Sequence, residues 1–358
     1  MPPVRVLVVD DSVVVRKLLS EALASSPEIQ LAGTASSGAI ALAKIPQINP
    51  DVITLDIEMP GLNGIETLTE IRKLYPKLPV IMFSTLTEQG AAITLEALSL
   101  GASDYLTKPT NSASLADAMV QVRSDLTAKI LTLAGRVRST VPLQLATAAN
   151  RAPHSSEIEI LAIGTSTGGP NALAEVIPQL PENFRVPTVI VQHMPPLFTR
   201  LLAERLDSQS QLSVHEAEAG TPLEPGHVWI APGDYHMTVA RRGVKTVLAL
   251  NQDPPENSCR PAVDPLFRSV ARAYGPHVLA VVMTGMGSDG ARGAAYIREG
   301  GGAILVQDEH SSVVWGMPGA VLQSAGADKI CSLSEISQEI LRRVSSSRTK
   351  AAILSSRM

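Results

Sequence analysis

Residues 4–12 read VRVLVVDDS, an apolar and mostly β-branched run that ends in two aspartates and a serine. Such a run predicts a strand that is buried on both faces, as in a parallel sheet covered by helices. Four further runs, each followed by a helix-like segment, have the same character: LAGTAS (31–36), DVITLDIE (51–58), PVIMFST (79–85) and SDYLTKP (103–109). This repeat predicts an α/β domain with five parallel strands.

A second α/β series begins with EIEILAIGTS (157–166). Its later strands are TVIVQHM (188–194), HVWIAPG (227–233), HVLAVVMTG (277–285) and AILVQDE (303–309). The segment MTVARRGVKTVLAL (237–250) predicts an antiparallel hairpin that turns at Arg241, Arg242 and Gly243, because glycine readily adopts the positive φ of a tight turn. We therefore predict a second, doubly wound and mostly parallel α/β domain with a hairpin insertion.

The composition between and after the two series differs from theirs. No acidic residue occurs from 126 to 156, and this segment is rich in Ala, Ser, Thr and Pro, which is typical of a linker. We predict domains at 1–125 and 157–345, joined by a linker at 126–156. The serine-rich end of the chain, residues 346–358, predicts a flexible tail.

The overall composition excludes several classes of protein. A chain of 358 residues suits two domains, and 45% hydrophobic with 18% charged residues suits buried cores rather than disorder. The formal net charge of −4 and the lack of a strong basic patch argue against a nucleic-acid partner. Since no apolar run could span a bilayer or serve as a signal peptide, we expect a cytoplasmic protein without membrane insertion. Cys259 and Cys331 offer neither a disulfide framework nor a metal-ligand spacing.

Acidic and polar residues stand where the strands of the first domain end. Asp10 and Asp11 follow the first strand, Asp56 the third, Ser84 the fourth and Lys108 the fifth. In open α/β sheets ligands bind at this edge, and three neighbouring carboxylates repel one another unless a hard cation such as Mg²⁺ lies among them. We therefore predict that Asp56 accepts a phosphoryl group beside Mg²⁺, with Lys108 and Ser84 on its oxygens. Each residue alone has an ordinary explanation, such as a helix cap or a solvated lysine, but the five together favour the site.

The second domain offers a serine nucleophile. GTSTGG (164–169) satisfies the G-x-S-x-G pattern of a tight strand-to-helix turn that exposes Ser166 and aims helix N–H groups at an oxyanion. Alone the loop is a modest signal, because Gly/Ser/Thr loops also bind phosphates or merely connect elements. His193 ends the next strand as the candidate base, and Asp289 follows a later strand as the acid that orients the imidazole. We predict that these three side chains meet above one sheet.

The loop GMGSDG (285–290) allows a second interpretation. It also fits the G-x-G-x-x-G pattern of a dinucleotide site, with Asp308 placed at the end of the next strand as the ribose-binding acid. The carboxylate of Asp289 would then repel the pyrophosphate, and Ser166 and His193 would have no use. The hydrolase interpretation is therefore favoured over a dinucleotide-binding domain.

The blocks VVDDS, LDIEMPGLNG, FST and GASDYLTKP resemble the receiver domain of response regulators, over about the first third of the chain. The resemblance implies a flavodoxin-like fold, Asp56 as the phosphoacceptor and a cis bond before Pro109. It also implies two sets of residues, with Mg²⁺ held by Asp10, Asp11, Asp56 and the backbone carbonyl of Glu58, and with a switch made of Ser84, Tyr105 and Lys108. Receivers commonly drive DNA-binding domains, but a basic helix-turn-helix is not evident in the second half.

The blocks IGTSTGGP, QHMPP, APGDYHM, RPAVDPLF, TGMGSDG and VWGMPGA together resemble the CheB-type protein-glutamate methylesterases of bacterial chemotaxis. The resemblance implies hydrolysis of glutamyl methyl esters on methyl-accepting chemoreceptors, and often deamidation of receptor glutamines, without a cofactor for the hydrolysis. It makes Ser166 the nucleophile, His193 the general base and Asp289 its orienting partner, with the backbone N–H of Met286 as an oxyanion donor.

An enzyme fused to a phosphorylation switch is most simply restrained by that switch. We therefore expect the receiver to cover the serine cleft, and phosphorylation of Asp56 by a chemotaxis histidine kinase to shift the equilibrium toward an uncovered state. We expect the chain to be a monomer.

Overall fold

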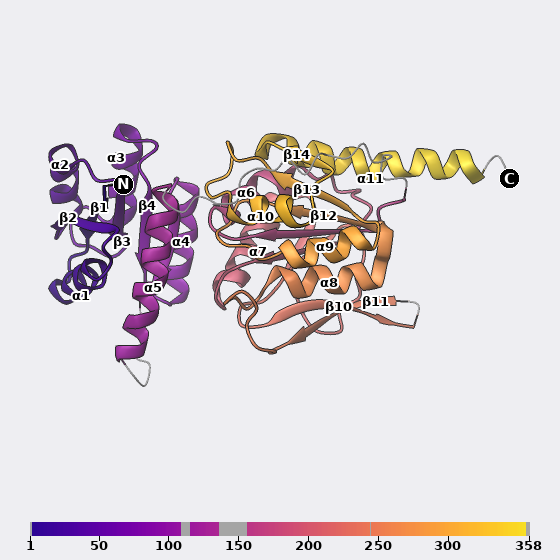
Figure 1. The fold of residues 1–358 in the computed structure, drawn as a ribbon, viewed down its shortest axis with the longest axis horizontal. Coiled ribbons are helices and arrows are strands. Elements are labelled where there is room, and N and C mark those ends of the chain that lie inside the picture. The colour runs from indigo at the N-terminus through magenta and orange to yellow at the C-terminus, as the bar shows by residue number, and fades with distance from the viewer. Residues whose placement is uncertain (1, 109–114, 136–155, 244, 356–358) are drawn as a thin grey trace. The chain divides into compact units, whose positions relative to one another are not determined.

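The computed structural model describes residues 2–108, 115–135, 156–243 and 245–355 (Figure 1). These residues form two compact units that divide near residue 140, and each is described by itself. Among the described residues, no helix has both the length and the apolar character that crossing a lipid bilayer requires.

The first unit is a five-stranded parallel sheet with the strand order β2-β1-β3-β4-β5, which confirms the predicted repeat. Its strands are β1 (Val4–Val9), β2 (Ile29–Ala35), β3 (Val52–Asp56), β4 (Val80–Ser84) and β5 (Asp104–Thr107). Its helices are α1 (Val13–Ala24), α2 (Gly38–Ile48), α3 (Gly64–Leu74), α4 (Glu88–Ser99) and α5 (Leu115–Leu133). Helix α1 begins directly after the acidic residues because the Ser12 hydroxyl accepts a hydrogen bond from the Val15 N–H.

Helix α5 extends past the predicted end of the first domain. Leu126 and Ile130 are fully buried and pack, with residues of α1, against alternate residues of the central strands. The expected domain end at residue 125 therefore falls inside α5, because an apolar face continues along the helix beyond that residue. Of the expected linker, residues 136–155 lie outside the described residues.

The second unit is a seven-stranded parallel sheet with the strand order β14-β13-β12-β6-β7-β9-β8. Its strands are β6 (Ile160–Thr165), β7 (Thr188–Gln192), β8 (Ser213–Glu216), β9 (His227–Ile230), β12 (Val278–Val282), β13 (Ala303–Gln307) and β14 (Lys329–Cys331). Its helices are α6 (Gly169–Val176), α7 (Phe198–Gln209), α8 (Val263–Tyr274), α9 (Ala291–Glu299), α10 (Gly316–Ser324) and α11 (Leu333–Ser355), and short 3₁₀ turns follow α6 and α8.

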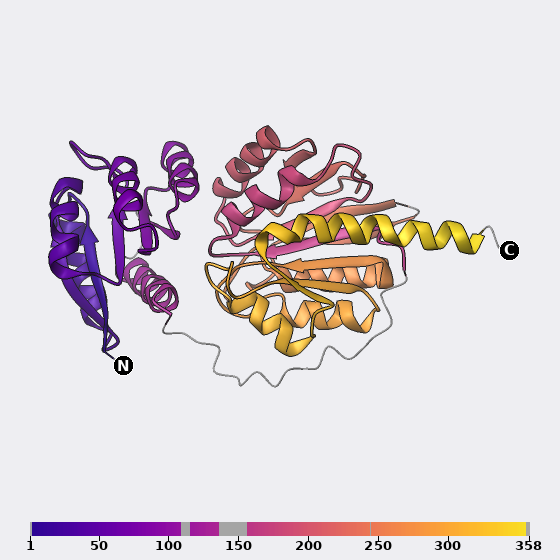
Figure 2. The ribbon, with the colours of Figure 1, turned by 90° about the horizontal axis from the view of Figure 1, so that it is seen from above.

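Helices cover both faces of this sheet. Figure 2 shows α6 and α7, in pink, on the opposite side of the strands from α8 and α9, in orange. The α8 side buries Leu266, Phe267 and Val270 against alternate residues of β6, β7 and β12. Because both faces are covered, the central strands carry uninterrupted apolar residues and place their polar residues at their ends.

The predicted hairpin is present as β10 (His236–Arg242) and β11 (Lys245–Asn251), with Arg242 opposite Lys245. Gly243 has a φ of 65°, as the tight turn requires. The hairpin packs on α8, because Met237, Val239 and Leu248 join the same hydrophobic core.

The chain ends in a long helix. Helix α11 begins beside Ser332, whose N–H donates to the Glu335 carboxylate at 2.9 Å. It continues to Ser355 and so includes most of the segment for which a flexible tail was predicted. The flexibility of that segment stays a prediction.

Candidate active site

The acidic residues of the first unit lie together, as the sequence predicted. Carboxylate oxygens of Asp10, Asp11 and Asp56 lie within 4.8 Å of one another at the carboxyl edge of the sheet. Asp10 and Asp56 are buried, and the Oδ2 atom of each has no hydrogen-bond partner among the described residues. Buried oxygens without donors are costly unless a cation binds them, so this donor set fits Mg²⁺.

Lys108 is the cation that the structure places in this cluster. Its Nζ lies 2.7 Å from Asp56 Oδ1 and 3.6 Å from Asp10 Oδ2. Burial, together with the charge of Asp10, raises the pKa of Asp56 to about 6, although Lys108 opposes this shift. Burial likewise raises the pKa of Asp10. The three carboxylates therefore carry more negative charge than Lys108 alone can neutralise, and the cluster can bind a further cation.

The remaining receiver residues are near this edge but are not all directed at Asp56. The Ser84 hydroxyl is buried against α4, where it accepts a hydrogen bond from Thr94 Oγ1 at 2.7 Å and donates to the Gly90 carbonyl at 3.1 Å. The Glu58 N–H donates to Asp56 Oδ1 at 3.4 Å. Ser84 thus stands at the predicted strand end, but its hydroxyl must turn before it can contact a group on Asp56.

Tyr105 and the bond before Pro109 were also singled out. The Tyr105 ring faces the Lys129 ammonium group, whose Nζ lies 5.7 Å from the ring centroid. Lys129 is also paired with Asp104, so the tyrosine is held between β5 and α5. Pro109 lies outside the described residues, so its expected cis bond stays a prediction.

In the second unit, the predicted turn between β6 and α6 presents Ser166. Of residues 161–170, Ser166 alone is not buried. The turn is tight, because Gly168 has a φ of 78° and a Cβ on Gly169 would lie 1.9 Å from Gln192 Oε1. Only glycines allow the backbone to turn here, and the turn leaves the serine hydroxyl accessible at the end of the strand.

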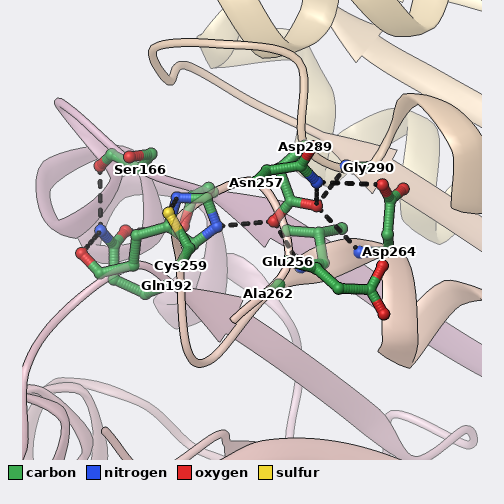
Figure 3. Close-up of polar contacts among 12 residues, drawn as sticks. Ser166, Gln192, Glu256, Asn257, Cys259, Ala262, Asp264, Asp289 and Gly290 are labelled. Carbon is green, nitrogen blue, oxygen red and sulfur yellow. Dashed lines mark hydrogen bonds and ion pairs between the residues drawn. The ribbon is translucent and has the colours of Figure 1, made fainter. Parts of the chain in front are cut away.

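Gln192 connects this turn to the end of β7. Its Nε2 donates to the Ser166 carbonyl at 2.9 Å, and its Oε1 accepts from the Thr165 hydroxyl at 2.7 Å (Figure 3). The His193 N–H donates to the Thr165 carbonyl at 3.2 Å. These bonds fix the serine turn and His193 in register with each other. Sequence reasoning overlooked Gln192, because its position directly before His193 looks like ordinary strand.

His193 and Asp289 form the predicted pair. His193 Nε2 lies 2.7 Å from Asp289 Oδ2, and their side chains are 11% and 2% exposed. Burial lowers the pKa of His193, but the hydrogen bonds with Asp289 and Cys259 outweigh burial and raise it. Burial raises the pKa of Asp289, but its hydrogen bonds, first that with His193, outweigh burial and lower it. Asp289 therefore stays ionised and stabilises the positive charge that His193 acquires on accepting a proton.

Asp289 is held by donors from four other residues. Its Oδ1 accepts hydrogen bonds from the Asn257 side-chain amide at 2.8 Å, the Gly290 N–H at 2.9 Å and the Asp264 N–H at 3.1 Å (Figure 3). Its Oδ2 also accepts from the Val263 N–H at 2.6 Å. A carboxylate with so many fixed donors cannot rotate away from the imidazole, so the orientation of His193 is fixed through it.

Asn257 is a second residue that sequence reasoning missed. Its Nδ2 donates to Asp289 Oδ1 and, at 3.1 Å, to the buried Asp264 Oδ2. Its backbone adopts a φ of 51°, which asparagine tolerates better than most residues. The available signal was its place in the polar loop PENSCRP (255–261), but this loop follows the antiparallel hairpin and not a strand of the parallel sheet, so the pattern gave no reason to place it beside Asp289.

Ser166 approaches this pair without bonding to it. Among the described residues, its hydroxyl makes no hydrogen bond with His193, whose Nδ1 instead lies 3.5 Å from Cys259 Sγ. The serine packs against the loop that carries Asp289, since a Cβ on Gly285 would lie 2.9 Å from Ser166 Cβ. Two of the three predicted side chains are thus joined directly, and the third lies against the same loop. Unliganded catalytic sites often have such loose contacts, which tighten when substrate binds.

The loop GMGSDG is anchored at the serine turn and not at a nucleotide site. The Gly285 carbonyl accepts hydrogen bonds from the N–H groups of Gly316 and Met317, at the start of α10. Asp289 is buried, and the half-buried Asp308 accepts hydrogen bonds from the N–H and the hydroxyl of Ser311. Both acids of the dinucleotide interpretation are therefore engaged within the protein. The half-buried Met286 lies directly after Gly285, and its role as an oxyanion donor stays a prediction.

Comparison with known proteins agrees with this geometry. A family model for the CheB methylesterase matches residues 161–340, and one for the response regulator receiver domain matches residues 6–120. A protein-glutamate methylesterase/protein-glutamine glutaminase from Trichodesmium erythraeum is 52% identical over 96% of this chain and 100% of its own length. One from Nocardioides sp. is 51% identical over 97% of each chain.

A solved structure is similar to the second unit. The catalytic domain of the CheB methylesterase from Thermotoga maritima is 42% identical, covers 52% of this chain and 98% of its own, and superposes with a TM-score of 0.51. These matches rule out a DNA-binding or dinucleotide-binding output domain as the main interpretation. With both family models matched and half of its residues shared with full-length relatives, the chain belongs to the CheB methylesterases that carry a receiver domain.

Proposed function

We propose that this chain hydrolyses glutamyl methyl esters of chemoreceptors, and deamidates receptor glutamines, with Ser166 as the nucleophile. The proposal depends on one observation: the buried His193–Asp289 pair lies at the same sheet edge as the accessible Ser166 turn. The substrate class is supported by the relatives with the same two domains, which are named for both activities.

The first half of the reaction uses the nitrogen of His193 that Asp289 leaves free. Nε2 is engaged by the carboxylate, so Nδ1 accepts the proton from Ser166 as Oγ attacks the ester carbonyl. The imidazolium forms beside the ionised Asp289, which stabilises it. The proton then passes to the methoxide oxygen, and methanol leaves an acyl-enzyme on Ser166.

Water completes the reaction at the same site. His193 removes a proton from a water molecule as its oxygen attacks the acyl carbonyl, and it returns that proton to Ser166 Oγ as the ester bond to the serine breaks and the glutamate carboxylate leaves. For a glutamine substrate the same steps release ammonia in place of methanol. The backbone N–H groups at the start of α6 and of Met286 are our candidates for holding the oxyanion.

This mechanism is tested with a methylated receptor fragment. Rapid mixing of enzyme and fragment should release a burst of methanol equal to the enzyme concentration when deacylation is the slower step. Mass spectrometry of the quenched protein should find the acyl group on the peptide that contains Ser166. If the acyl group is found on another peptide, or if none is trapped although methanol accumulates in a burst, the proposed nucleophile is wrong.

The first domain supplies the regulation in this proposal. Receiver domains bind Mg²⁺ at the phosphorylation site, and here Asp10, Asp11, Asp56 and the backbone carbonyl of Glu58 would hold the ion. When bound, Mg²⁺ offsets negative charge on the entering phosphoryl group. Asp56 is the acceptor, and Lys108, already 2.7 Å from it, holds a phosphoryl oxygen.

Once phosphorylated, Asp56 draws the Ser84 hydroxyl away from Gly90 and Thr94, and this rotation carries the change to α4. A histidine kinase of the chemotaxis pathway is the proposed phosphodonor. The cytoplasmic location and the monomeric state stay predictions.

A further inference from the structure

A second hollow lies in the catalytic domain, between the hairpin and α8. It has a volume of about 420 Å³ and contains none of Ser166, His193 and Asp289. Its walls come from β10, from α8 and from the segment that links β11 to α8. The residues that line it are His236, Thr238, Val239, Arg241, Asn251, Asp253, Glu256, Pro265, Arg268, Ser269, Arg272 and Ala273.

Three guanidinium groups face two carboxylates in this pocket. Arg268 is already paired, because its two terminal nitrogens bind the two oxygens of Glu256. Arg292, which is not part of the lining, adds a second pairing to Glu256. By contrast, the guanidinium groups of Arg241 and Arg272 make no hydrogen bond or ion pair within the described part of the chain, although Arg241 lies close enough to the Tyr274 hydroxyl to interact with it electrostatically. Two guanidinium groups are therefore available to a ligand.

Apart from Asp253, the rest of the lining is neutral. His236 accepts a hydrogen bond at Nδ1 from the Ala262 N–H and donates from Nε2 to the Pro254 carbonyl, which is the pattern of an uncharged imidazole. Val239, Pro265 and Ala273 supply apolar surface, while Thr238 and Ser269 supply hydroxyl groups. Only Asp253 adds negative charge that is not compensated inside the pocket.

We propose that this pocket binds a small multivalent anion that carries phosphate or carboxylate groups. Arg241 reaches it from the hairpin and Arg272 from the helix, so a ligand with two anionic groups can bridge the two walls. Guanidinium groups bind phosphates and carboxylates through paired N–H donors. This pairing favours phosphate and carboxylate ligands over simple monovalent anions. The pocket is open to solvent on one side, and its volume of about 420 Å³ is that of a small-molecule site, not of a surface for a folded partner.

The pocket shares one short turn with the catalytic residues. The Glu256 N–H donates to the Cys259 carbonyl at 3.1 Å and the Cys259 N–H donates to the Glu256 carbonyl at 2.9 Å, which closes the turn. Asn257, inside the turn, holds Asp289, and Cys259 contacts His193. An anion that binds Arg268 in place of Glu256 frees Glu256 and so shifts this turn. Binding of the anion in the pocket therefore changes the rate at which the ester substrate is hydrolysed.

Calorimetric titration of the full chain tests the binding. Inorganic pyrophosphate and citrate are titrated separately, so that a phosphate preference is distinguished from a carboxylate preference. We expect Arg241→Ala and Arg272→Ala each to weaken binding of the preferred anion roughly tenfold, because each removes a charge-assisted contact. The matched control is Arg242→Ala, which removes an exposed arginine from the same strand but outside the pocket lining.

Two results would overturn the proposal: no binding of either anion, or equal weakening by Arg242→Ala, which would mean that only surface charge attracts the anion. Circular dichroism melts confirm that the variants fold. Titration of the Ser166→Ala variant should give the wild-type affinity, so the binding result does not depend on the proposed hydrolysis. A saturating anion that leaves kcat unchanged in the wild type would refute the coupling through Glu256.

Discussion

The two domains both place carboxylates at the carboxyl edge of a parallel sheet, but they surround them in opposite ways. In the first domain, Asp10 and Asp56 each keep a buried oxygen without a donor, and burial raises the pKa of both. In the second, Asp289 accepts hydrogen bonds from five residues and its pKa is lowered. Carboxylates that are to bind a cation have few hydrogen-bond donors around them. A carboxylate that is to orient a base accepts as many hydrogen bonds as it can.

The largest effect should come from removing the nucleophile. Ser166→Ala should lower turnover by about 10⁴-fold or more, because a group that forms the covalent intermediate cannot be replaced by its neighbours. Methanol release from methylated receptor is the measurement. Ser288→Ala, an exposed serine in the loop that holds Asp289, is the control and should retain wild-type turnover. Comparable rates for Ser166→Ala and wild type would show that Ser166 is not the nucleophile. The hydrogen bonds that Asp289 accepts would then have no role in catalysis.

Asp289→Asn tests whether the saturated carboxylate acts through its charge. Turnover should fall by about 10³-fold to 10⁴-fold, since the imidazolium loses its stabilising partner. His193 works as a base only when deprotonated, and the Asp289 charge raises its pKa. Activity in the wild type should therefore rise with pH through this pKa, and in the variant the rising limb should move to lower pH. A pH profile of kcat/KM that keeps its limb in place would contradict this role.

Asn257→Gly tests one donor of that set. Glycine removes the amide but accepts the positive φ at this position, so the backbone is not strained as it would be by alanine. We expect kcat to fall roughly tenfold to a hundredfold with little change in KM, because a buried hydrogen bond to a charged group is lost. With one donor fewer, Asp289 should hold the His193 proton more tightly, and the pH limb should move upward.

The control for Asn257→Gly is Asn183→Gly, an exposed asparagine away from the site. If both variants lose activity equally, or if Asn257→Gly only lowers the melting temperature while kcat stays unchanged, Asn257 has a merely structural role.

The donor-poor cluster predicts a pH dependence of metal binding. The pKa of Asp56 is raised to about 6, so protons compete with Mg²⁺ as the pH falls through that value. Affinity for Mg²⁺ should be roughly tenfold lower at pH 5 than at pH 7.5, as measured by calorimetry on the full chain. Asp56→Asn should lose most of the affinity and its pH dependence. An affinity that is constant over this range would show that Asp56 does not ligate the ion.

The smallest effect expected is that of regulation. If the receiver restrains the active site, as we propose, a chain that begins at Ser156 should be several-fold more active than the unphosphorylated full chain. Acetyl phosphate with Mg²⁺ should raise the activity of the full chain and leave Asp56→Asn unchanged. Equal or lower activity of the shortened chain would count against simple occlusion. It would mean that the Asp56 cluster does not control the site of Asp289 by covering it.

Several features of both sites could be read from the chain alone. Strand ends are recognisable because an apolar run stops at a polar residue, and all parallel strands of one sheet end at the same edge. That local pattern was enough to bring Asp10, Asp11 and Asp56 together, and to pair His193 with Asp289 across 96 residues of sequence. It was equally sufficient for the hairpin turn at Gly243.

Loop geometry was not readable in this way. Asn257 and Cys259 contact the candidate catalytic residues from a loop whose path depends on packing against distant elements, and Gln192 at the end of β7 does so only because the Ser166 turn folds back against it. The orientation of the Ser84 hydroxyl toward α4, and the pocket between β10 and α8, likewise depend on which surfaces meet. The sequence by itself determined most of the strands and the residues at their ends, because periodicity and strand-end polarity are local, but it did not reveal the short edge strands β8 and β14. Only the tertiary structure decided which side chains support those residues, because hydrogen bonds between loops exist only once the loops are packed together.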